Sequence, residues 1–142
     1  MIDSRTAPYA ALLLRVSLGV MFIAHAFLKI LVFTLPGTAQ FFASVGFPEW
    51  TAYAVTAAEL IGGVLLIAGV YSRWVALALV PVLLGAVSVH WGNGWLFTAQ
   101  NGGWEYPVFL IAAALVQTLL GDGKYALVDV VRSTPQLQTA RA

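Results

Sequence analysis

Apolar residues gather in four stretches of the chain, and none of them alternates with polar residues as a half-buried strand would. The stretches run from Pro8 to about Val32, from about Thr51 to Val70, from about Trp74 to Val89, and from about Tyr106 to Leu120. The first can cross a hydrocarbon core of about 30 Å, whereas the last two need tilt or aromatic ends to do so. The pattern predicts an all-α fold, a four-helix transmembrane bundle.

The connection between the first two helices is too long for a simple turn. Residues 38–45 (TAQFFASV) lie between Pro36-Gly37 and Gly46, residue types that interrupt helices. We expect a short helix there, lying in the membrane interface or capping the bundle. The later loop 92–103 carries large apolar side chains, so it is expected to fold back onto the bundle.

Composition supports a membrane protein. Of the 142 residues, 61% are hydrophobic and only 9% are charged, against about 25% charged in soluble domains. Residues 1–131 are expected to form one domain, followed by a polar, disordered tail at 132–142. The formal charge of +1 gives no reason to expect nucleic-acid binding. The absence of cysteine excludes a thiol nucleophile, cysteine-ligated clusters and c-type haem attachment.

The distribution of basic residues predicts the orientation. With four crossings, one side of the membrane holds Arg5, Arg73, Lys124, Arg132 and Arg141. The opposite side has only Lys29 nearby. The positive-inside rule then places both termini in the cytoplasm.

Ionisable side chains form a stripe along the first helix. Arg15, Leu18, Phe22, His25 and Lys29 are spaced 3, 4, 3 and 4 residues apart, so they share an arc of roughly 80°. A charged side chain near the bilayer centre costs about 2.5–3.5 kcal/mol, so this face must turn towards protein or a water-filled cavity.

Glu59 in the second helix is the natural partner for that stripe. Its estimated height lies between those of Arg15 and His25, so pairing with either or both is open. A structural ion pair and a functional site are equally compatible with its position, because carboxylates inside a membrane are functional candidates by default. The functional hypothesis makes Glu59 a buried proton acceptor, with Arg15 holding it ionised.

A second group of polar residues is expected at the outer mouth of the bundle. His25, Lys29, His90 and Glu105 fall at about the same level, with Trp104 beside them. A quinone or small aromatic ligand could use this site, because His, Lys and Trp can donate hydrogen bonds to its carbonyl oxygens.

Two other chemistries remain open at these residues. A proton relay could run through Glu59, His25 and Glu105. Haem or metal ligation by His25 and His90 is less favoured, because no HxxxH or ExxH spacing supports it and each helix carries a single histidine.

Several motifs resemble those of the DoxX family. They are RVSLGVMFIAHAFLK from Arg15 to Lys29, Phe41 with Gly46-Phe47-Pro48, Glu59-Leu60-Ile61-Gly62-Gly63, Gly69-Val70-Tyr71-Ser72-Arg73, His90, Gly102-Gly103-Trp104-Glu105-Tyr106-Pro107, and Gly121 to Asp129. The resemblance covers residues 10–130, and GGWEYP is its most specific piece. Ser72 and Ala126 depart from the family pattern, which usually has Thr at the first position and often Ser at the second.

The resemblance implies a four-helix inner-membrane protein. Relatives include the membrane subunit associated with thiosulfate:quinone oxidoreductase and proteins linked to quinone or oxidative-stress resistance. The family therefore implies a quinone-linked or redox-linked role and leaves open whether the chain itself catalyses a reaction.

The sequence thus supports two hypotheses. In the first, the chain interacts with a quinone or serves a soluble oxidoreductase, with Glu59 and His25 as catalytic groups. Its substrate end would consist of Arg15, Lys29, His90, Trp104 and Glu105. Since the chain has no cofactor-binding motif, electrons would pass through a bound quinone or a partner subunit. In the second, it is a non-catalytic anchor, or a carrier of small molecules or protons, whose buried charges serve assembly.

Overall fold

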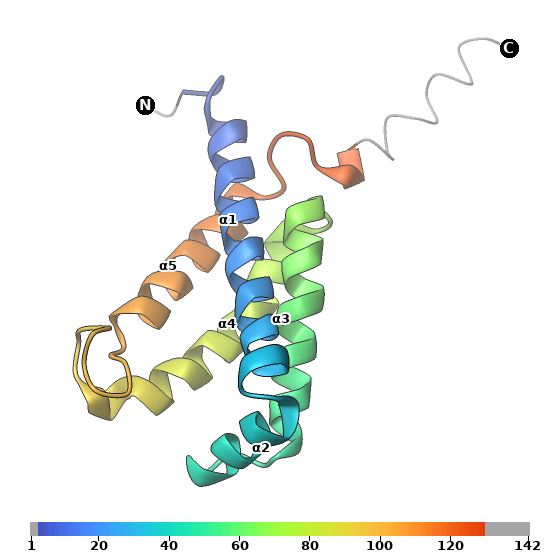
Figure 1. Ribbon diagram of the computed structural model, residues 1–142. Helices are drawn as coiled ribbons and strands as arrows, with labels where there is room; N and C mark the ends of the chain where they lie inside the picture. Colours follow the sequence, from blue (N-terminus) through green and yellow to red (C-terminus); the bar gives the residue numbers. More distant parts are fainter. Residues whose placement is uncertain (1–2, 130–142) are drawn as a thin grey trace, which may run out of the picture.

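The computed structural model describes residues 3–129, and every regular element in that range is a helix (Figure 1). The elements are α1 (Ala7–Phe27), the π-helical η1 (Leu28–Val32), α2 (Leu35–Ser44), α3 (Trp50–Ala68), α4 (Ser72–His90), the 3₁₀ turn η2 (Trp91–Asn93) and α5 (Glu105–Leu120). Each of the four predicted helices is present, with ends within two residues of the expected ones. The all-α prediction is confirmed. The predicted tail at 132–142 lies outside the described residues.

Within the part of the chain that the structure describes, three segments have the length and composition to cross a membrane. They are Ala7–Val32, Trp50–Ala68 and Ser72–Asn93. The apolar α5 has 16 residues, which at 1.5 Å per residue gives about 24 Å. Many of the most exposed side chains are large and apolar, as in Leu31 (72% exposed) and Leu119 (79%). Such an exterior fits a helical bundle in lipid.

The short helix α2 begins earlier than its sequence indicated. Thr34 occupies the position before the helix, where its side-chain oxygen accepts a hydrogen bond from the Gly37 N–H at 3.2 Å. Pro36 therefore lies in the first turn, where the missing N–H of proline is not needed. Pro36 and Gly37 start this helix instead of preceding it.

Helices α1 and α3 run antiparallel (Figure 1) and are in close contact at two glycines. A Cβ atom added to Gly19 would lie 2.7 Å from the Gly63 carbonyl oxygen, and one added to Gly63 would lie 2.8 Å from the Gly19 carbonyl oxygen. Only glycine at both positions allows this contact, which is a common way for membrane helices to pack.

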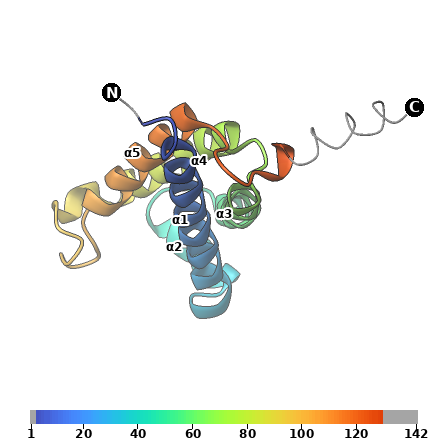
Figure 2. The same cartoon turned by 90° about the horizontal axis from the view of Figure 1, so that it is seen from above.

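Helices α4 and α5 form a second antiparallel pair that crosses the first pair and then diverges from it (Figures 1 and 2). The buried core lies where the two pairs cross and consists of Leu18, Phe22, Leu66, Ala76, Leu79, Leu83, Leu110 and Ala114. We call the end of the bundle where α1 begins and α3 ends the Arg15 end. The opposite end, where α1 ends and α3 begins, is the Lys29 end.

Candidate functional site

The buried carboxylate of Glu59 pairs with Lys29. The Lys29 Nζ lies 2.8 and 2.9 Å from the two carboxylate oxygens of Glu59. The two side chains are only 16% and 7% exposed. Helical side chains lean towards the N-terminus of their own helix. Because α1 and α3 are antiparallel, Lys29 and Glu59 lean towards each other.

Arg15 does not contact Glu59, and the expectation that it would hold this carboxylate ionised is wrong. Its Nη1 donates to the carbonyl oxygens of Leu66 (2.9 Å) and Ile67 (2.6 Å), and its Nη2 to those of Lys124 (3.0 Å) and Tyr125 (3.1 Å). Arg15 leans towards the start of α1, which lies beside the end of α3. It is 1% exposed and lines neither of the cavities described below.

The Lys29–Glu59 pair lies at the wall of a cavity of about 460 Å³, here called the ion-pair cavity. All five α-helices contribute to it. Its polar side chains are His25, Lys29, Thr51, Glu59, His90 and Tyr106, and its phenylalanines are Phe22, Phe41, Phe42 and Phe47. The rest of the wall is aliphatic, so the cavity combines an apolar body with a few polar groups, as ligand sites do.

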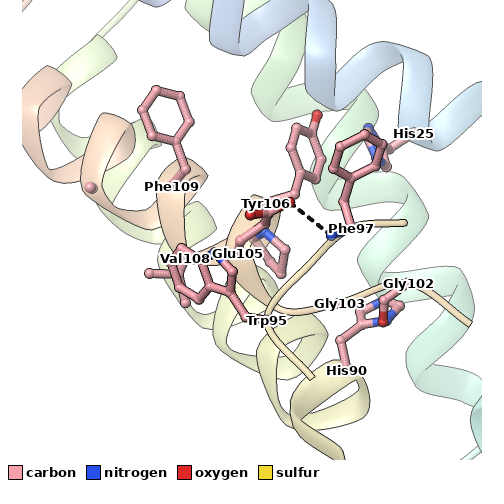
Figure 3. A pocket seen from close by; sticks show the side chains of 12 residues that line it. His25, His90, Trp95, Phe97, Gly102, Gly103, Glu105, Tyr106, Val108 and Phe109 are labelled. Carbon is pink, nitrogen blue, oxygen red and sulfur yellow. Dashed lines mark hydrogen bonds between the residues drawn. The ribbon is translucent and has the colours of Figure 1, made fainter. Parts of the chain in front are cut away.

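A second cavity of about 890 Å³ lies beside the loop between α4 and α5, and we call it the loop cavity (Figure 3). Trp95 and Phe97 of the loop and Glu105 at the start of α5 belong to its lining. Four residues line both cavities, namely His25, His90, Tyr106 and Pro107. The two cavities therefore share these four residues, which we call the partition.

Hydrogen bonds determine which nitrogen of each imidazole is free. The His25 Nδ1 lies 2.8 Å from the Met21 carbonyl oxygen. The His90 Nδ1 lies 3.1 Å from the carbonyl oxygens of Asn101 and Gly102. A carbonyl oxygen only accepts, so Nδ1 carries the hydrogen in each neutral ring and Nε2 presents a lone pair. His25 also stacks on Tyr106, with ring centroids 6.0 Å apart and 22° between the planes.

Glu105 and Lys29 do not meet, contrary to expectation. The Glu105 Oε1 accepts a hydrogen bond of 2.8 Å from the Phe97 N–H, drawn dashed in Figure 3, and this side chain lines the loop cavity alone. Lys29 lines only the ion-pair cavity. The predicted single mouth is therefore divided, because α4 and α5 diverge from α1 and α3 towards this end.

Trp104 was expected beside the other residues of the mouth and in the substrate end, yet it lines neither cavity. It stacks on Trp91 at 4.9 Å between centroids and meets Trp95 edge-on at 4.5 Å. Within residues 3–129, no three His, Asp or Glu side chains lie together as a metal site would require.

The site predicted from the sequence included neither Tyr106 nor the phenylalanines of the α2 region. Tyr106 contacts His25 and lines both cavities. The position of Tyr106 follows from the face of α5 that the structure buries, which hydropathy alone does not reveal. The buried residues of α5 are Pro107, Leu110, Ala114 and Gln117, and their spacing of 3 or 4 puts Tyr106 beside that face, with Phe109 on another.

These features define a helical membrane protein with a largely apolar, aromatic-walled cavity at one end. The sequence pattern of the DoxX family matches residues 10–91, more than half of the chain. The protein belongs to the DoxX family. The match includes Arg15, His25, Lys29, Glu59 and His90, and it ends before α5.

A curated relative is the "Putative oxidoreductase CatD" of Bacillus subtilis (strain 168). The two chains are 43% identical over 76 residues, which is 54% of this chain and 55% of the relative. The chain thus spans about half the length of the curated relative it matches. No solved structure matches the chain.

Proposed function

We propose that this DoxX-family protein binds a small aromatic ligand of the quinone class in the ion-pair cavity, in support of an oxidoreductase partner. One observation carries the proposal: the wall of an aromatic-lined cavity of about 460 Å³ includes the Lys29–Glu59 ion pair, whose side chains are 16% and 7% exposed. Ligand sites are typically about 300–1,000 Å³, mostly apolar, with a few convergent polar groups.

The chemistry of the wall suits a planar ring. Phe41 and Phe42 of α2, Phe47 after it, and Tyr106 of α5 offer aromatic surfaces, while the charged pair and the two imidazoles lie at the polar part of the wall. The name of the relative, a putative oxidoreductase, supports a redox setting for the ligand. In this proposal the chain holds the ligand, and electrons pass between the ligand and the partner.

The test is ligand-dependent thermal unfolding of the detergent-purified protein. Duroquinone or its hydroquinone should raise the unfolding temperature, because a ligand at 100 times its Kd stabilises the native state by about 2.7 kcal/mol. Ala86→Phe places a ring in the ion-pair cavity, since Ala86 is part of its wall, and should abolish the shift.

The matched control is Leu84→Phe, which adds a ring to the same helix at a position that is 54% exposed and outside both cavities. This variant should respond to the ligand as the wild type does. If folded wild type shows no shift with either ligand at millimolar concentration, the proposal is wrong.

We further propose that the chain crosses the cell inner membrane four times, with α5 as the fourth crossing. Both termini would then lie in the cytoplasm. Arg73 and Lys124 lie at the Arg15 end, and the positive-inside rule places that end in the cytoplasm. Alkaline phosphatase fused within residues 97–101 should be active, because that loop would face outward. The same enzyme fused at the C-terminus should be inactive, and the opposite pattern would reverse the orientation.

One observation favours proton transfer as a second candidate function. His25 and His90 line both cavities, so titratable groups extend from Glu105 in the loop cavity to Glu59 in the ion-pair cavity. Proteoliposomes with an internal pH dye should then leak protons faster with the wild type than with His25→Phe. Equal leakage would exclude this candidate.

A further inference from the structure

We infer that the ion-pair cavity selects its ligand by hydroxyl groups, taking a phenol or hydroquinone in preference to the corresponding quinone. The inference rests on the proposed function and goes beyond it, because it states which form of the aromatic ligand is held. It follows from the hydrogen bonds that the polar side chains of the cavity wall already make.

The imidazoles of His25 and His90 are the hydrogen-bond acceptors in question. Each uses its Nδ1–H on a main-chain carbonyl oxygen, at 2.8 Å for His25 and 3.1 Å for His90. Among residues 3–129 neither Nε2 has a hydrogen-bond partner, and neither is among the buried unpartnered atoms. Both nitrogens are therefore accessible acceptors that lack a donor.

The hydrogen-bond donors of the cavity wall already have acceptors in the protein. Lys29 directs its ammonium at both Glu59 oxygens and, at 3.5 Å, at the His25 carbonyl oxygen. The Thr51 hydroxyl donates to the Pro48 carbonyl oxygen at 2.6 Å. The Tyr106 hydroxyl donates to the Met21 sulfur at 3.6 Å. Each donor side chain lining this cavity thus has an acceptor within the protein.

The balance of donors and acceptors determines what can bind. A quinone has two carbonyl oxygens that only accept, so it must compete for these donors with the acceptors that they already have, which for Lys29 include the Glu59 carboxylate. A hydroquinone or phenol brings its own O–H donors, which match the free Nε2 atoms directly. From the sequence we expected His, Lys and Trp to donate hydrogen bonds to a quinone. We infer instead that the ligand donates hydrogen bonds to the histidines.

The expected preference is about tenfold or more. One net hydrogen bond changes affinity about two- to twelvefold, and a buried acceptor left without a donor adds to the difference. The preference concerns binding alone and requires no electron transfer by the chain.

Three ligands with one tetramethylbenzene ring separate the contributions: duroquinone, its hydroquinone, and the dimethyl ether of that hydroquinone, which keeps both oxygens and lacks both O–H groups. Dissociation constants come from the concentration dependence of thermal unfolding, measured without oxygen. Ala86→Phe in the same detergent reports binding outside the cavity. The hydroquinone should bind the wild type about tenfold more tightly than either other ligand.

Variants of the two histidines test the cause. His25→Phe keeps an aromatic ring against Tyr106 and removes the Nε2 acceptor, so it should weaken hydroquinone binding about tenfold and change quinone binding less than threefold. His90→Phe provides the same comparison on α4 if His25→Phe does not fold.

The outcomes distinguish this inference from the proposed function. Equal binding of quinone and hydroquinone, abolished by Ala86→Phe, would overturn the inference and keep the ligand site. A full preference retained in both histidine variants would also overturn it. Failure of all three ligands to bind the folded wild type would remove the ligand site as well.

Discussion

Two buried cations on one continuous helix have opposite surroundings. Arg15 is held by four main-chain carbonyl oxygens and borders neither of the two cavities. Lys29, 14 residues further along the chain, is held by a side-chain carboxylate at a cavity wall. Main-chain carbonyls cannot change partner without local unfolding, whereas a pair of side chains can open to admit a ligand. The partner of a buried charge therefore indicates its role better than the charge itself.

Packing is tight at the Arg15 end and leaves a cavity at the Lys29 end. At the Arg15 end, a Cβ atom added to Gly69 would lie 2.7 Å from the Arg15 Nη1 and 2.8 Å from the Ala126 Cα. The guanidinium thus joins the end of α3 to the segment after α5. At the Lys29 end, α4 and α5 diverge from α1 and α3, and α2 adds its phenylalanines to the intervening cavity (Figure 1).

The largest effect is expected for Arg15→Met, which should lower the free energy of unfolding by about 3–5 kcal/mol. Each buried carbonyl left without a donor costs about 1–3 kcal/mol, although the Leu66 oxygen keeps the Gly69 N–H as a donor. Unfolding by SDS in mixed micelles measures the change. Because the partners belong to the backbone, no second side-chain substitution should restore stability. A loss below about 1 kcal/mol would contradict a structural role for Arg15.

Gly63→Ala should come next, with a loss of about 1–3 kcal/mol. Its new methyl group would lie 2.7 Å from the Ile23 Cγ1 and 2.8 Å from the Gly19 oxygen, and overpacking of this kind typically has that cost. Gly85→Ala is the matched control, because a Cβ there meets nothing within 4 Å. The control should be neutral or stabilising in the same SDS titration. If both variants behave alike, the close contact of α1 and α3 is not essential.

Lys29→Met should cost about 1–2 kcal/mol, less than loss of Arg15, since the Lys29 side chain is 16% exposed and water screens the unpaired Glu59. Here a second substitution should help. Lys29→Met with Glu59→Met should recover most of the stability, because replacing both members of a buried pair by apolar groups is often neutral. A double-mutant cycle gives the coupling energy. Additive losses would show that the two residues are not coupled.

The apolar pattern was sufficient to predict the positions of the helices. The pairing of the charged side chains could not be predicted from their heights along the helices alone. The sequence-based estimate placed Glu59 between Arg15 and His25 by counting residues along straight helices. It omitted the lean of the side chains towards each helix N-terminus and the π-helical turn at Lys29. Those two features bring Lys29 to Glu59 and take Arg15 away from it.

The divergence of α4 and α5 was likewise not predictable from the sequence. In a membrane protein, lipid-facing and protein-facing apolar residues are chemically alike, because lipid tails are as apolar as leucine. Phe109 (69% exposed) and Leu110 (9%) adjoin each other in sequence, and hydropathy does not distinguish them. The sequence could therefore place Glu105 at the same end of the bundle as Lys29, but it could not show that the two residues line different cavities.

The smallest effect is expected at Trp104. Its rings contact Trp91 and Trp95 and face neither cavity, so Trp104→Leu should cost about 0.5–1.5 kcal/mol of stability through the lost aromatic contacts. Hydroquinone affinity should change less than twofold. Tyr106→Leu makes the matched comparison on the next residue, because it removes the ring that stacks on His25 and should weaken the hydroquinone about tenfold. A larger loss of affinity from Trp104→Leu than from Tyr106→Leu would mean that the ligand enters the loop side of the partition, and would move the proposed site away from the Lys29–Glu59 pair.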